Sequence, residues 1–144
     1  MGGRLRFILS GGAPLSSEVR NFMTVVFSTP IFEAYALTET SGILTCTAQW
    51  DVKSGHVGGV LPCLRLQIRD VPYLKQNQNK ELQIGEVYVK GNSVFQGYFK
   101  NPSLTAEAID KDGWLRVGDL AILHNNGAIE IIERVDELKK LQNG

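Results

Sequence analysis

The feature of this sequence that most constrains its fold is a short apolar run closed by two glycines. Residues 5–10 have the length and composition of a buried strand, and Gly11 and Gly12 end it in a tight turn. A second apolar run, residues 31–35, follows Pro30. With a helix between them, the two runs predict a strand–helix–strand unit that belongs to an α/β layer.

The helix is predicted between Pro14 and Pro30. Ser16 and Ser17 are candidate N-caps, and Glu18 places a negative charge in the first turn, where the helix dipole favours it. Apolar residues then recur at helical spacing, which predicts one apolar face. These residues are Val19, Phe22, Met23 and Val26.

The pattern changes after residue 55, where apolar and polar residues alternate. Residues 64–69 and 86–90 alternate with a period of two, which is typical of half-buried strands. Residues 121–123 and 129–132 are apolar runs on either side of Asn125-Asn126-Gly127, a strong hairpin signal. The second half is therefore predicted to be antiparallel.

We predict an α/β plus β fold, in which the end of a strand–helix–strand layer is followed by a small antiparallel β-sheet or barrel. Residues 1–55 form the first part, residues 56–133 the second, and residues 134–144 lead out of it. Asn101 and Pro102 start a short helix within the second part, as cap and first residue.

Composition limits the classes of function. The 15 basic and 15 acidic residues cancel, so overall charge favours neither nucleic acid nor an anionic membrane as a partner. No apolar run approaches the ~20 residues that span a bilayer, and the N-terminus lacks a signal-peptide pattern. Cys46 and Cys63 lack metal-ligand spacing and are interpreted as reduced thiols in a cytoplasmic setting.

Three short runs carry candidate chemistry, and each has an ordinary structural alternative. Ser10-Gly11-Gly12-Ala13 lets the backbone approach a flat ligand closely, although a plain strand-to-helix turn explains it as well. The second run covers residues 35–42. There Tyr35 can stack on a base, Thr38 can donate to a phosphate and Glu39 can bind a hard divalent cation. A surface turn with a helix cap is the alternative.

The third run covers residues 113–120 and ends in Gly118-Asp119-Leu120. The Asp119 carboxylate, at the start of an apolar strand, can accept two charge-assisted hydrogen bonds from a ribose diol, each worth about 1.5–3 kcal/mol. Arg134 follows the last expected strand and can reach the same ribose or a phosphate. A turn aspartate and a surface salt bridge are the alternatives. His56 and His124 are interpreted as turn and hairpin residues, not as catalytic groups.

Together and in this order, the runs resemble the adenylate-forming acyl-CoA synthetases, and most of all the long-chain fatty acyl-CoA synthetases. The resemblance covers nearly the whole chain and implies the fold of that family's large N-terminal domain. Another branch, such as a coumarate ligase or a peptide-synthetase adenylation domain, is one alternative, and a non-catalytic nucleotide-binding remnant is another. Further runs that support the resemblance are residues 10–15, 55–63, 70–72 and 140–144.

The resemblance implies a ligase of fatty acid metabolism that converts ATP, fatty acid and coenzyme A to acyl-CoA, AMP and pyrophosphate through an acyl-adenylate. Thr38 would hold the α-phosphate and Glu39 the magnesium ion. Asp119, assisted by Arg134, would bind the ribose hydroxyls. The residues that would frame the adenine are Gly11, Gly12, Ala13, Glu33, Ala34 and Tyr35, with Tyr35 stacking on it.

The resemblance also implies two residues of a domain hinge, Asp136 as the pivot and Lys140 as the lysine that follows it. The departures from the family pattern are mild. Ala36 occupies a position where the family usually has Gly, Val117 one where it has Thr, and Glu133 one where it has Asp.

The phosphate-gripping loop and the catalytic-lysine domain of the family are expected in N- and C-terminal portions beyond this chain. The fragment is therefore expected to be inactive alone. Its partners would be small molecules, and any membrane association would come from those portions. The parent enzyme is expected in the cytoplasm or on the cytoplasmic face of a membrane.

Overall fold

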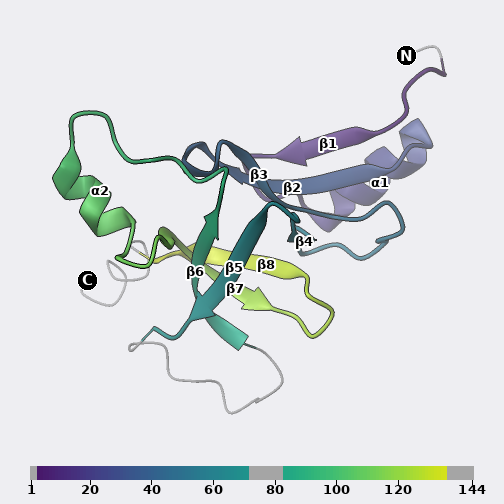
Figure 1. Ribbon diagram of the computed structural model, residues 1–144. Helices are drawn as coiled ribbons and strands as arrows, with labels where there is room; N and C mark the ends of the chain where they lie inside the picture. Colours follow the sequence, from purple (N-terminus) through teal and green to yellow (C-terminus); the bar gives the residue numbers. More distant parts are fainter. Residues whose placement is uncertain (1–2, 72–82, 136–144) are drawn as a thin grey trace, which may run out of the picture.

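The computed structural model describes residues 3–71 and 83–135, which form two four-stranded sheets (Figure 1). The first sheet consists of β1 (Ile8–Gly11), β2 (Ile31–Leu37), β3 (Gly42–Cys46) and β4 (Gly59–Val60). The second consists of β5 (Leu64–Arg69), β6 (Gln83–Gly91), β7 (Leu115–Leu123) and β8 (Ile129–Arg134). The helices are α1 (Ser17–Phe27), the 3-10 turn η1 (Thr38–Thr40) and α2 (Pro102–Ala108). In Figure 1, α1 and α2 lie at opposite ends of the molecule.

The first sheet contains the predicted strand–helix–strand unit. β1 and β2 are parallel, and α1 connects them. Ser16 caps α1 as predicted, because its hydroxyl accepts the N–H of Val19 at 3.3 Å. The antiparallel strand β3 was not predicted, and it makes the sheet mixed. β4 also pairs with β3, so the first sheet continues to Val60, past the boundary expected at residue 55.

The predicted apolar face of α1 is exposed and does not pack against the core. Phe22 is 66% exposed and Val26 55% exposed, and the one buried residue of the helix is Arg20. Helical periodicity defines a face of a helix, but it does not determine which surface covers that face.

The second sheet is antiparallel throughout, as the alternating pattern predicted. β7 and β8 form the predicted hairpin, in which the N–H of Gly127 donates to the carbonyl of His124 at 2.8 Å. Because β7 begins at Leu115, Asp119 lies within the strand and not at its start as expected. The predicted short helix is α2, whose N-cap Asn101 accepts the N–H of Leu104 at 3.0 Å.

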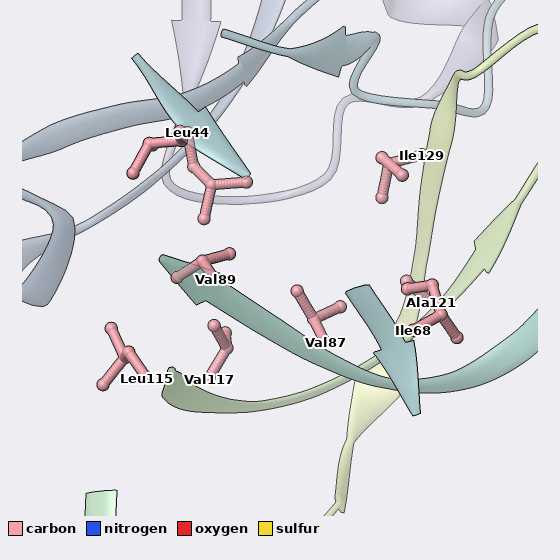
Figure 2. Close-up of a cluster of buried hydrophobic side chains, with 9 residues drawn as sticks. Leu44, Ile68, Val87, Val89, Leu115, Val117, Ala121 and Ile129 are labelled. Atoms are coloured by element: carbon pink, nitrogen blue, oxygen red, sulfur yellow. The ribbon is translucent and has the colours of Figure 1, made fainter. Parts of the chain in front are cut away.

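The main core joins the two sheets (Figure 2). Leu44 of β3 is fully buried and lies near Val87 and Val89 of β6, which are also fully buried. Since apolar burial stabilises by about 0.8 kcal/mol per methylene, this contact is a main source of cohesion between the sheets. The buried members of the cluster are Leu44, Leu64, Ile68, Val87, Val89, Leu115, Val117, Ala121 and Ile129.

Backbone contacts also join the first sheet to β8. The N–H of Val57 donates to the carbonyl of Ile129, and the N–H of Ile129 donates to the carbonyl of Gly58, both at 2.8 Å. Gly58 has φ +76°, and a Cβ there would collide with the carbonyl of Cys46. Only glycine therefore lets this segment lie so close to β3.

No helix within the described ranges has both the length and the apolar character needed to cross a membrane. Cys46 and Cys63 are free thiols.

Replacing Leu44 with Ala should lower the free energy of unfolding by about 2–5 kcal/mol, because it leaves a cavity between the sheets. Leu104→Ala is the matched control: Leu104 is 41% exposed on α2, and its truncation should cost less than about 1 kcal/mol. Urea unfolding of both variants measures the difference. Equal losses would show that the sheets do not depend on Leu44.

Candidate active site

A cleft of about 520 Å³ opens between the two sheets. It brings together segments that are far apart in the sequence, including parts of the first and third predicted runs and residues 35–37 of the second. Among the lining residues are Ser10, residues 12–15, 33–37 and 55–57, Asp119 and residues 131–134.

The glycine turn after β1 forms one wall of the cleft. Gly12 and Ala13 line it, and Gly12 has φ +87°, a conformation that favours glycine. Gly11 is not among the lining residues. A Cβ on Gly11 would lie 2.9 Å from the carbonyl oxygen of Ala34, so this glycine allows β1 and β2 to approach closely.

Tyr35 and Asp119 meet across the cleft, one from each sheet. The Tyr35 hydroxyl donates a hydrogen bond to Asp119 Oδ2, and Arg134 Nε lies 3.5 Å from Asp119 Oδ1. Asp119 is 6% exposed, whereas the Arg134 side chain is 60% exposed. Burial raises the pKa of Tyr35 far above its ordinary value, and the hydrogen bond and charge of Asp119 raise it further. The phenol therefore remains a donor at neutral pH.

The local form of β7 explains how the Asp119 carboxylate reaches this position. Gly118 has φ +81°, and the pairing of β7 with β8 shifts register between Leu120 and Ala121. Such irregularities bend a strand and redirect its side chains. Asp119 is paired with Arg134 across the two strands, so their side chains come from directly opposed positions.

Thr38 and Glu39 lie in η1, just after β2, and neither is among the residues that line the cleft. Thr38 is exposed and Glu39 is half-buried. Tyr98, from the segment between β6 and α2, donates its hydroxyl to Glu39 Oε1 at 2.9 Å. Burial raises the pKa of Tyr98, and the hydrogen bond to Glu39 raises it further, so this phenol also remains a donor.

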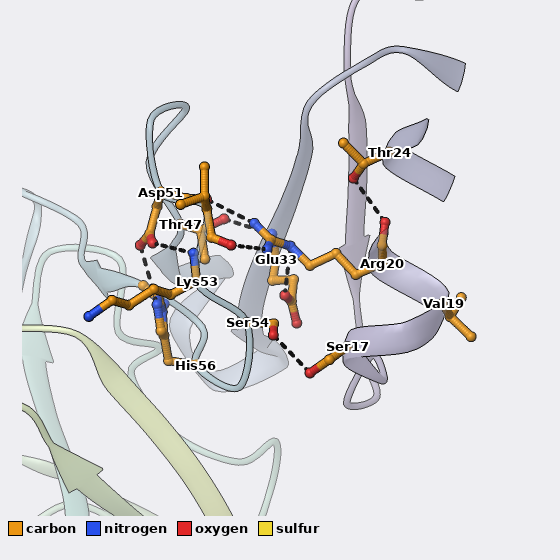
Figure 3. Close-up of polar contacts among 12 residues, drawn as sticks. Ser17, Val19, Arg20, Thr24, Glu33, Thr47, Asp51, Lys53, Ser54 and His56 are labelled. Atoms are coloured by element: carbon orange, nitrogen blue, oxygen red, sulfur yellow. Dashed lines mark hydrogen bonds and ion pairs between the residues drawn. The ribbon is translucent and has the colours of Figure 1, made fainter. Parts of the chain in front are cut away.

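A buried ion pair lies on the α1 side of the cleft (Figure 3). Arg20 Nε is 3.3 Å from Glu33 Oε1, and both side chains are 8% exposed. The remaining guanidinium nitrogens of Arg20 donate to the carbonyls of Asp51 and Val52 at 2.9 and 3.1 Å. Arg20 thus connects α1 and β2 to the loop that follows β3. Burial raises the pKa of Glu33, while the charge of Arg20 opposes that rise.

His56 lies near this ion pair (Figure 3). It is also one of the residues that line the cleft. Its Nδ1 accepts the N–H of Gly58 at 3.1 Å, so the ring proton is on Nε2. Nε2 lies 3.3 Å from the carboxylate of Asp51. His56 is 8% exposed, which makes it a buried structural residue of the loop and not only a turn residue.

Sequence reasoning missed Arg20, Asp51 and Tyr98, and it interpreted His56 as a turn residue only. Arg20 interrupts the apolar pattern of α1 without breaking it, and no local signal marks it as buried. Tyr98 follows a glycine in a segment without periodicity. Asp136 and Lys140 lie outside the described residues, so the structure says nothing of the predicted hinge.

Comparison with known proteins identifies the family. Residues 1–99 match the model of the AMP-binding enzyme family, and the chain belongs to that family. It is 40% identical over 144 residues to the human long-chain-fatty-acid–CoA ligase 1. It is 37% identical over 145 residues to the peroxisomal long chain acyl-CoA synthetase 7 of Arabidopsis thaliana. Both matches include the whole chain but only 20% and 21% of these relatives, so the chain spans about a fifth of their length.

Solved structures agree with this assignment. Apo MatB from Rhodopseudomonas palustris superposes with a TM-score of 0.79 at 29% identity, over 92% of this chain and 26% of that one. A malonyl-CoA ligase with methylmalonyl-CoA and AMP bound gives a TM-score of 0.76 at 28% identity, over 92% of this chain and 28% of that one. The predicted combination of an α/β layer and an antiparallel sheet is therefore the fold of adenylate-forming enzymes.

Arg20→Met should destabilise the chain by about 3–5 kcal/mol at pH 7, because it leaves Glu33 as a buried charge without a partner. Adding Glu33→Gln should recover part of this loss. Urea unfolding of the single and double variants measures the loss and the recovery of unfolding free energy. A double variant no more stable than Arg20→Met would show that Glu33 does not depend on Arg20 as its partner.

The loss in Arg20→Met should also shrink as the pH falls toward 4.5. Burial raises the folded-state pKa of Glu33 above the ordinary value of a glutamate, and removing Arg20 raises it further, because the charge of Arg20 opposes the rise. A raised carboxyl pKa means that the folded state takes up the proton first, so protonation favours folding over this range. If the stability loss of Arg20→Met did not change with pH, the loss could not come from the buried charge of Glu33.

Proposed function

We propose that this chain is the nucleotide-binding part of a long-chain fatty acid–CoA ligase. The meeting of Tyr35, Asp119 and Arg134 in one cleft carries the proposal, because these residues suit a base and a ribose. The 40% identity to the human long-chain ligase supports the substrate class. The complete enzyme would join a fatty acid to coenzyme A and convert ATP to AMP and pyrophosphate.

The cleft suits the nucleoside part of ATP. Its volume of about 520 Å³ is within the usual range for small-molecule sites. The adenine would lie between the backbone of Gly12 and Ala13 and the ring of Tyr35, with Glu33 and Ala34 beside it. Asp119 would accept the two ribose hydroxyls, and Arg134 would assist. Both Asp119 oxygens already have protein partners, so ribose would share or replace them.

The residues present also fit a magnesium ion held jointly with phosphates. The described part of the chain has no group of three or more His, Cys, Asp or Glu side chains that could bind a metal alone. Mg²⁺ typically takes one or two carboxylates and completes its shell with water and substrate phosphates. Glu39 would provide the carboxylate. When bound, magnesium neutralises charge on the phosphates.

In the first half-reaction, a fatty acid carboxylate would attack the α-phosphorus of ATP, and pyrophosphate would leave. Thr38 would donate a hydrogen bond to an α-phosphate oxygen, and Asp119 and Arg134 would hold the ribose so that the phosphate is in line. Positioning and charge stabilisation supply most of the catalysis in such transfers.

In the second half-reaction, the coenzyme A thiol would attack the carbonyl of the acyl-adenylate, and AMP would leave. We place the pivot between the two half-reactions at Asp136 and its following lysine at Lys140, both outside the described residues. We assign the activity to the complete enzyme, in the cytoplasm or on a cytoplasmic membrane face, and expect the 144 residues alone to be inactive.

A second candidate is a ligase for another carboxylic acid, since malonyl-CoA ligase is among the similar structures. Pyrophosphate exchange into ATP by the complete protein distinguishes the long-chain ligase from a ligase for another acid. Exchange that depends on palmitate and not on malonate is expected. Dependence on malonate alone would favour the second candidate, and the absence of exchange with any acid would favour a non-catalytic remnant.

In the complete enzyme, Asp119→Ala should weaken ATP binding by about 2–4 kcal/mol, because two charge-assisted hydrogen bonds to ribose are lost. The matched control is Asp112→Ala, which removes an exposed carboxylate and should leave ATP affinity unchanged. Calorimetric titration with ATP and with 2′,3′-dideoxy-ATP measures the effect. The native enzyme should prefer ATP strongly, and the Asp119 variant should not. A preference that survives in Asp119→Ala would exclude Asp119 as the ribose ligand.

A further inference from the structure

The segment between β6 and α2 packs against η1, which carries Glu39. The N–H of Phe95 donates to the carbonyl of Glu39 at 2.8 Å, so this segment holds the backbone of Glu39. Tyr98 of the same segment holds the side chain, through the 2.9 Å hydrogen bond from its hydroxyl to Oε1. Glu39 is thus held twice by a segment that follows it by more than 50 positions.

Only one oxygen of the Glu39 carboxylate is held in this way. Oε2 has no hydrogen bond or ion pair to any residue that the structure describes. A hydrogen bond to an ionised carboxylate is stronger than one between neutral groups, so it restrains the carboxylate plane effectively. The hydrogen bond at Oε1 therefore limits the rotation of the carboxylate, and Oε2 is available to a ligand.

Tyr98 is itself held firmly enough to act as a support. Its N–H donates to Thr105 Oγ1 at 2.9 Å, and its carbonyl accepts the N–H of Asn101 at 3.1 Å. Its ring packs edge-on against Phe95, with centroids 4.9 Å apart. Gly97 allows this arrangement, because at φ +145° a Cβ would lie 2.5 Å from the Thr105 side chain.

We propose that Tyr98 is a positioning residue for Glu39, and that its hydroxyl orients the carboxylate so that Oε2 faces the magnesium ion carried in with ATP. This inference rests on the proposed function. Partners that orient a metal-binding carboxylate typically contribute 10–100-fold to metal affinity. Tyr98 would touch neither the metal nor the substrates.

The test uses the complete enzyme and Tyr98→Phe, which removes the hydroxyl and keeps the ring. The Mg²⁺ concentration that gives half-maximal pyrophosphate exchange should rise about tenfold, while kcat at saturating Mg²⁺ is retained. Electron paramagnetic resonance of Mn²⁺, titrated with ATP present and no fatty acid, should show a similar loss of affinity. ATP affinity without metal should not change.

Tyr88→Phe is the matched control. The Tyr88 ring lies under the guanidinium of Arg69 at 3.9 Å, and its hydroxyl makes no hydrogen bond to any residue that the structure describes. Removing that hydroxyl should leave both metal readouts unchanged. Glu39→Gln is the second comparison. It should raise the Mg²⁺ requirement more than Tyr98→Phe does, and adding Tyr98→Phe to it should have little further effect.

The outcomes distinguish a failure of this inference from a failure of the proposed function on which it rests. If Glu39→Gln raises the Mg²⁺ requirement and Tyr98→Phe behaves like Tyr88→Phe, the role of Tyr98 is overturned and that of Glu39 stands. If Glu39→Gln leaves the Mg²⁺ and Mn²⁺ readouts unchanged, the magnesium assignment fails and the inference fails with it. A Tyr98→Phe variant that loses thermal stability with unchanged Mn²⁺ affinity would show a packing role only, which also overturns the inference.

Discussion

The contact between Leu44 and the valines of β6 is the one on which the rest of the structure depends. Sheets of four strands have little apolar area of their own, and burial across the interface supplies cohesion that neither sheet has alone. The backbone pair between Val57 and Ile129 then holds the loop after β3 against β8. Because the cleft lies between the sheets, its walls keep their separation only while these contacts persist.

Two buried carboxylates at the cleft, Glu33 and Asp119, have protein partners, and this affects both stability and chemistry. Glu33 is balanced by Arg20, and Asp119 by the Tyr35 hydroxyl and Arg134. An unpaired buried charge is costly, so each pair is a fixed element that a ligand must join or displace. Glu39 differs, because it is only half-buried and Tyr98 holds one of its oxygens while the other remains available.

Much of the fold could be predicted from local patterns. The capping serine of α1, the alternation in β5 and β6 and the Asn-Gly turn each determine their own element, since the signal lies within a few residues. β3 escaped prediction because residues 42–46 follow a run of capping residues that favoured a turn. The pattern in α1 predicted an apolar face but not its exposure, because periodicity does not determine which surface covers that face.

The sequence by itself determined the family, the elements and the residue types suited to a nucleotide, because each is a matter of local order along the chain. Only the tertiary structure decided which of those residues meet. Tyr35 and Asp119 are 84 positions apart, and Glu39 and Tyr98 are 59 apart. Their contacts depend on how the two sheets pack. That packing results from many weak apolar interactions, so no single position in the sequence predicts it.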